Sequence, residues 1–82
     1  MNGKTQFYVI SDRESSIRRD MTEIYNALVE KGYDPISQIV GYILAEDPTY
    51  ITGHKNARNL MTAIDRDDLL RVLVESYIRK GE

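Results

Sequence analysis

The sequence predicts an all-α protein, a compact bundle of four main short helices plus a helical turn. Apolar residues recur at intervals of three and four through most of the chain, which is the spacing of a helix with one buried face. Two Asp-Pro pairs, Asp34–Pro35 and Asp47–Pro48, mark helix starts, because Asp accepts bonds from free N–H groups and Pro pre-sets φ. The strand-like stretch Phe7–Ile10 has no partner strand, so no sheet is expected.

The composition indicates one small domain of 82 residues. We expect a flexible N-terminal arm at 1–11 and a single helical domain at 12–82. A chain this short buries only about 60% of its unfolded surface, so a homodimer would enlarge its core. A net charge of −2 disfavours generic nucleic-acid binding, and no run of 18 apolar residues favours membrane insertion. The lack of cysteine excludes disulfides and is compatible with the cytoplasm.

The first helix is predicted over about Ser16–Lys31, where apolar residues form one stripe. Ser15 or Ser16 can cap its start. Gly32 supplies the left-handed residue that commonly ends a helix.

The second helix is predicted to start at Asp34 and Pro35, to end before the second Asp-Pro pair, and to be the central helix of the fold. Gly41 inside it costs up to about 1 kcal/mol relative to Ala, which suggests that another backbone passes close by. Six of its residues are expected to pack in the core or across a dimer interface: Ile36, Ile39, Val40, Gly41, Ile43 and Leu44.

A short turn, DPTYI, closed by Gly53, is expected to follow, and then a third helix from about His54 to Ile64. Asp65 with Asp68 resembles a capping box. A fourth helix is therefore predicted over about Arg66–Arg79.

The single His54 suggests a catalytic or metal site, but no second His and no Cys accompanies it. No set of nucleophile, oriented base and oxyanion donors is evident, and no glycine-rich phosphate loop occurs. We therefore expect no metal, no cofactor and no enzyme activity.

A small DNA-binding helical module is the alternative interpretation. Residues Thr49–Met61 read as a turn followed by a helix that carries Lys, Asn and Arg, the residue types that reach phosphates and base edges. The acidic residues that follow and the negative net charge make nucleic acid an unlikely partner.

Thr5 lies beside Lys4 in the terminal arm, where a kinase can capture an extended segment. On these residues alone, an unmodified surface threonine is the simpler interpretation.

The chain resembles the IreB/ReoM family of small regulatory phosphoproteins of Gram-positive bacteria. Three segments carry the resemblance over about Tyr25–Ile78: KGYxPxxQIVGYxL from Lys31, DPxYI from Asp47, and HKxAR from His54. Thr5, Phe7 and Tyr8 also match the family's N-terminal TxFY.

The resemblance implies an all-helical cytoplasmic homodimer without catalytic activity. It implies that Thr5 is phosphorylated by a Ser/Thr kinase with extracellular PASTA domains. It further implies a link to peptidoglycan synthesis and cell-envelope control through Clp-dependent proteolysis of the enzyme that commits UDP-N-acetylglucosamine to that pathway. His54, Lys55, Arg58 and Arg66 become the candidate partner-binding residues.

The chain departs from the family pattern at two places. Thr52 and Gly53 stand where the family usually has Pro-Arg, and Thr62 and Ala63 stand where it has a basic pair. These departures predict a weakened or altered set of partners.

Overall fold

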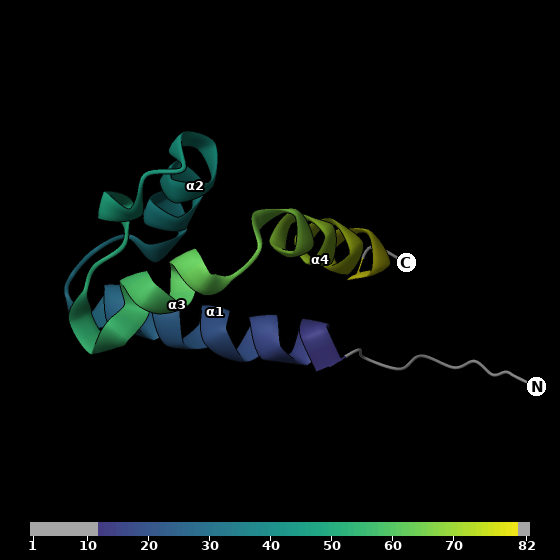
Figure 1. Ribbon diagram of the computed structural model, residues 1–82, viewed down its shortest axis with the longest axis horizontal. Helices are drawn as coiled ribbons and strands as arrows, with labels where there is room; N and C mark the ends of the chain where they lie inside the picture. The colour runs from purple at the N-terminus through teal and green to yellow at the C-terminus, as the bar shows by residue number, and fades with distance from the viewer. Residues whose placement is uncertain (1–11, 81–82) are drawn as a thin grey trace, which may run out of the picture.

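The computed structural model describes residues 12–80, and over this range the protein is all-α, as predicted (Figure 1). Its elements are α1 (Asp12–Glu30), α2 (Pro35–Ala45), the 3₁₀ turns η1 (Pro48–Tyr50) and η2 (His54–Asn56), α3 (Ala57–Ala63) and α4 (Arg66–Lys80). The predicted arm at 1–11, with Thr5, lies outside the described residues.

The first helix begins at Asp12, four residues before the predicted start. Asp12 and Glu14 place negative charge in the first turn, where it stabilises the helix by attracting the free backbone N–H groups. Ser16 lies inside the helix, and its Oγ accepts a bond from Arg19 Nη2 at 3.2 Å. The predicted cap at Ser15 or Ser16 is therefore wrong.

The end of α1 is as predicted. Gly32 has a φ of +83°, the left-handed conformation that glycine adopts most readily. The N–H of Tyr33 donates to Leu28 O at 3.0 Å, so the chain reverses within two residues.

The start of α2 also follows the prediction. Asp34 accepts bonds from Ser37 N at 3.3 Å and from Ser37 Oγ at 3.0 Å, and these bonds lower the pKa of its carboxyl group. Glu46, in the left-handed conformation with φ of 54°, ends the helix.

The third predicted helix is interrupted. Lys55 and Asn56 have φ of 51° and 66°, a conformation that costs non-glycine residues free energy, so η2 and α3 are separate elements. The fourth helix agrees with its prediction, because Asp65 accepts the N–H of Asp68 at 3.0 Å directly before it begins.

The core lies between α1 and α3, which make the most extensive contact in the structure. Ile24, Leu28, Ile51, Met61 and Leu69 are its largest fully buried side chains. Helix α2 adds only Ile39 to the buried set. Within one chain the central helix is therefore α1, and the predicted burial of the second helix at a dimer interface remains a prediction.

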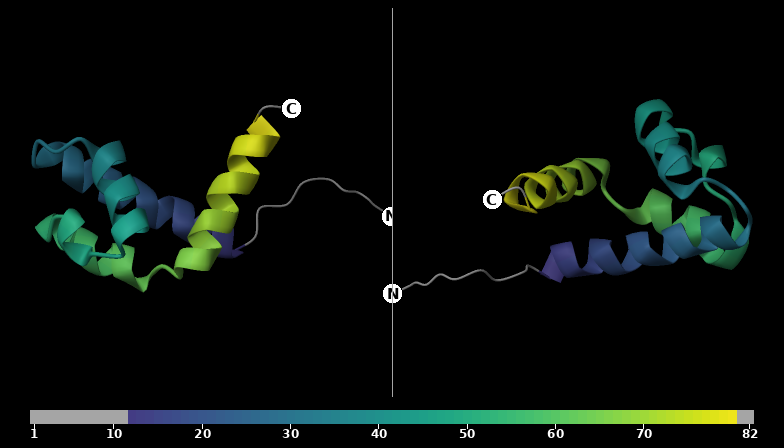
Figure 2. Two further views of the ribbon diagram at one scale, coloured as in Figure 1. Left: turned by 90° about the horizontal axis from the view of Figure 1, so that it is seen from above. Right: turned by 180° about the vertical axis from the view of Figure 1, so that it is seen from behind.

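Two helices present apolar faces outward. On α2, Ile36, Val40 and Leu44 are exposed at a spacing of four residues. Helix α4 is anchored near its start by Leu69 and by an ion pair between Asp68 and Arg13, and its later residues extend away from α3 (Figure 2). Its exposed apolar residues are Leu70, Leu73, Val74, Tyr77 and Ile78. None of the described helices is long and apolar enough to cross a membrane.

Candidate functional site

Residues 46–56 join α2 to α3, and we refer to them as the connecting segment. Ile51 is fully buried and anchors this segment in the core. Side chains from α1, α2, α3 and α4 hold its backbone or its side chains in place. The segment is therefore a fixed surface feature, although most of its residues are exposed.

The first half of the connecting segment is built on the second Asp-Pro pair. Asp47 accepts bonds from Thr49 N at 3.0 Å and Thr49 Oγ1 at 2.7 Å, which lower the pKa of its carboxyl group. Gln38 of α2 donates to Tyr50 O at 2.8 Å. The Tyr50 ring lies against Gly41, where an added Cβ would be 2.4 Å from Cε1. The close neighbour of Gly41 is thus an aromatic ring, whereas the sequence suggested a backbone.

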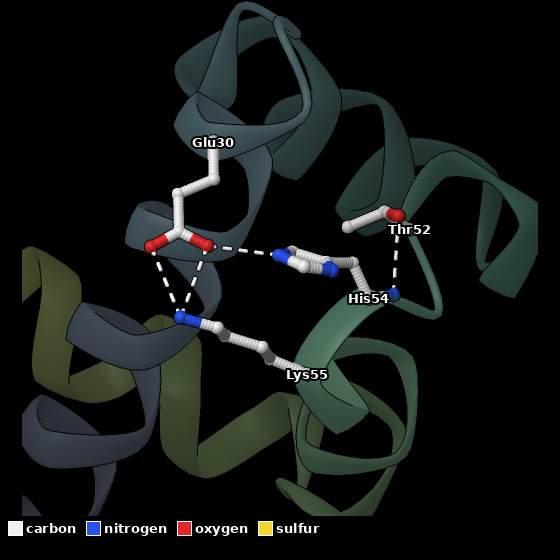
Figure 3. Close-up of polar contacts among 4 residues, drawn as sticks. All are labelled: Glu30, Thr52, His54 and Lys55. Carbon is white, nitrogen blue, oxygen red and sulfur yellow. Dashed lines mark hydrogen bonds and ion pairs between the residues drawn. The ribbon is translucent and has the colours of Figure 1, made fainter.

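The second half of the connecting segment is bound to the end of α1 through Glu30 (Figure 3). His54 Nε2 lies 2.8 Å from Glu30 Oε1, and Lys55 Nζ lies 3.1 Å from the same oxygen. His54 N donates to Thr52 Oγ1 at 3.2 Å. One carboxylate therefore gathers two of the four predicted partner-binding residues.

The contacts of Glu30 predict a pH-dependent contribution to stability. The hydrogen bond with His54, followed by that with Lys55, lowers the pKa of the Glu30 carboxyl group. A lowered folded-state pKa means that this stabilisation is present above the ordinary glutamate pKa and is lost as pH falls through the folded value. We expect Glu30→Gln to lower the melting temperature at about pH 6, and the difference from wild type to shrink as pH falls below the ordinary glutamate pKa.

Thermal unfolding of both proteins across this range checks the prediction. Asp34 and Asp47 titrate in both proteins, so their effects cancel from the difference. A difference in melting temperature that stays constant from pH 6 to pH 3 would contradict the assignment.

Arg58 and Arg66 bind two different parts of the chain. Arg58 Nε donates to Ile51 O at 2.9 Å and to Pro48 O at 3.2 Å, which fixes the connecting segment to α3. Arg66, at the start of α4, donates to Ile43 O at 2.6 Å and pairs with Glu46 at 2.9 Å. Arg66 thus binds the end of α2 and the first residue of the connecting segment, while Arg58 binds two carbonyl groups further along that segment.

The predicted packing residues of α2 divide into inward and outward groups. Ile39 is buried, Ile43 packs against the core, and Gly41 contacts Tyr50. Ile36, Val40 and Leu44 are exposed in the single chain. The interface predicted for these three residues remains a prediction.

Sequence reasoning did not assign Glu30, Gln38 or Tyr50 to the site. Glu30 is 24 residues from His54, and Gln38 is 12 residues from Tyr50. No local pattern reports contacts at such separations. The presence of a glycine, Gly41, inside the second helix was the one signal that another group approaches α2 closely.

The departures at Gly53, Thr62 and Ala63 lie on the surface. Gly53 has a φ of −78°, which any residue adopts, and the nearest atom to an added Cβ is 4.0 Å away. Packing therefore does not exclude an arginine at position 53.

Three carboxylates, those of Asp65, Asp67 and Asp68, come within 4.8 Å of one another at the start of α4. Asp65 caps the helix and Asp68 binds Arg13. Asp67 pairs with Arg71 at 3.8 Å, so each of the three carboxylates already has a partner in the fold.

Comparison with known sequences identifies the family. The sequence pattern of the family described as "IreB regulatory phosphoprotein" matches residues 3–79. A UPF0297 protein of Lachnoclostridium phytofermentans is 47% identical over 75 residues, which cover 90% of this chain and 85% of that protein. The family is one of regulatory phosphoproteins and not a known enzyme family. The chain belongs to the IreB family of regulatory phosphoproteins.

Proposed function

We propose that the protein is a non-enzymatic cytoplasmic regulator that a PASTA-domain Ser/Thr kinase phosphorylates on Thr5. The observation that carries this proposal is the family match, which extends over residues 3–79 and so includes Thr5. A phosphate adds about −1.5 to −2 charge and three strong acceptor oxygens to the arm. Its regulatory effect is to create or block a contact with a partner.

The experiment that tests the kinase assignment uses the full-length protein, the kinase domain of the host's PASTA kinase and ATP. We expect incorporation of one phosphate into the wild type and none into Thr5→Ala. Thr22→Ala and Thr49→Ala are matched controls, because both threonines are exposed in the folded domain. Equal incorporation into wild type and Thr5→Ala would exclude Thr5 as the acceptor.

The downstream role that we propose is control of the cell envelope through Clp-dependent proteolysis of the enzyme that commits UDP-N-acetylglucosamine to peptidoglycan. The connecting segment supports a docking role, because it is exposed and held in one conformation, and fixing a surface before binding reduces the entropic cost of association. Lys55 would offer a partner its positive charge, and His54 its ring nitrogen, only in competition with Glu30.

We also propose that two copies associate through the outward apolar faces of α2 and α4. Leu44 and Tyr77 are each 79% exposed, and apolar surface of this extent on a small domain marks an interaction site. In a symmetric dimer the same patch on both copies is covered at once. Such a dimer would add the buried surface that an 82-residue chain lacks.

The alternative of a DNA-binding module receives little support from the placement of its cations. Lys55 is paired with Glu30, and Arg58 Nε points at backbone carbonyl groups of the connecting segment. The helix that would enter the groove, α3, has only seven residues.

A further inference from the structure

A groove of about 310 Å³ lies between α1, α2 and α4. Ile17, Met21, Tyr25, Ile36 and Leu73 line it with apolar surface. Among the described residues that line it, Arg18 is the one charged residue, and no carboxylate faces the groove. Tyr25, Ile36 and Leu73 remain exposed at its rim, so the groove suits an uncharged, apolar occupant.

The volume of the groove limits the size of its occupant. It is at the lower end of the range of about 300–1,000 Å³ found for ligand pockets. This space admits one or two large side chains, but a whole helix is about 10–12 Å across. A short extended segment with aromatic side chains therefore fits better than a helix from a second copy.

The chain itself carries such a segment beside the groove. Residues 7–10 read Phe-Tyr-Val-Ile, with no charge, and join α1 at Asp12. Phe7 is five residues from Asp12, so an extended arm brings it up to about 17 Å along α1. Ile17 and Met21 lie about 7.5 and 13.5 Å from Asp12 along the same helix, at 1.5 Å per residue. Both groove residues are within reach.

We propose that Phe7–Ile10 binds back into this groove of its own chain, with the Phe7 and Tyr8 rings against Met21 and Leu73. The covalent link gives a short tethered segment an effective concentration in the millimolar range, so even weak apolar contacts populate the bound state. The groove shares Ile36 and Leu73 with the outward faces of α2 and α4, whereas Val40, Leu44 and Tyr77 lie outside it, so a second copy that covers these three leaves the groove to the arm. This inference does not depend on phosphorylation of Thr5.

A paramagnetic label tests the proposal in the full-length protein. The sequence has no cysteine, so Lys4→Cys accepts a nitroxide at a single position. We expect broadening of the NMR methyl signals of Met21 and Leu73. The methyl signal of Thr62 on α3 serves as the internal control and should broaden little. The broadening should be lost with Phe7→Ser/Tyr8→Ser and retained with the matched control Gln6→Ser. Because these substitutions lie in the arm, they leave the helical domain intact.

A mixed sample distinguishes the arm of the same chain from that of a second copy. Nitroxide-labelled chains without isotope are combined with isotope-labelled chains without nitroxide. Broadening of Met21 and Leu73 in this mixture would place the arm in the groove of another copy and overturn the proposal. Equal broadening in wild type and Phe7→Ser/Tyr8→Ser would overturn it as well.

Discussion

Replacing Ile51 with alanine should destabilise the fold by about 2–5 kcal/mol. The reason is that Ile51 is fully buried and is the one core residue of the connecting segment. Its loss leaves a cavity in the core, and it removes the anchor that positions the carbonyl group bound by Arg58. Ile51→Val retains most of the volume and should cost only about 0.5–1.5 kcal/mol.

Urea unfolding followed by circular dichroism checks this prediction. All variants are compared at one protein concentration, because self-association would make stability depend on concentration. A cost below about 1 kcal/mol for Ile51→Ala would show that the site lies outside a well-packed core.

Replacing Gly41 with alanine should destabilise the protein by about 1–3 kcal/mol, although alanine is the better helix former. The added Cβ would lie 2.4 Å from Tyr50 Cε1 and 2.6 Å from Cδ1, so the ring must leave its place against α2. In a Tyr50→Ala background the obstacle is gone. Gly41→Ala should then stabilise by up to about 1 kcal/mol, which reverses the sign of the effect.

A double-mutant cycle with the single variants Gly41→Ala and Tyr50→Ala and their combination measures this coupling by urea unfolding. Stabilisation by Gly41→Ala in both backgrounds would mean that the Tyr50 ring does not rest on Gly41. A similar loss of stability on Gly41→Ala in both backgrounds would mean that a group other than the Tyr50 ring clashes with the added methyl group.

The sequence predicted those parts of the fold that depend on neighbouring residues. Asp34 with Pro35, Gly32 and Asp65 each fix a helix end through bonds within a few residues, and all three act as expected. The break at Lys55 and Asn56 was missed, because neither residue is the glycine that usually marks a left-handed conformation.

The candidate site was predictable only in part. The family resemblance made His54, Lys55, Arg58 and Arg66 candidate partner-binding residues. Within the chain, their partners are Glu30, two carbonyl groups of the connecting segment, Glu46 and the end of α2. These contacts join residues that are distant in sequence, so they follow from the packing of α1, α2 and α3. The same limit applies to α2 and α4, whose apolar stripes do not reveal which residues a single chain leaves exposed.

We propose that one chain is half of the functional unit, because α2 and α4 expose apolar faces that a second copy would cover. Light scattering across a dilution series tests this most directly. We expect about twice the mass of one chain for the wild type and for the control Thr62→Glu, but the mass of one chain for Val40→Glu/Leu44→Glu with unchanged helix content. A wild-type protein that has the mass of one chain at every concentration would contradict the claim.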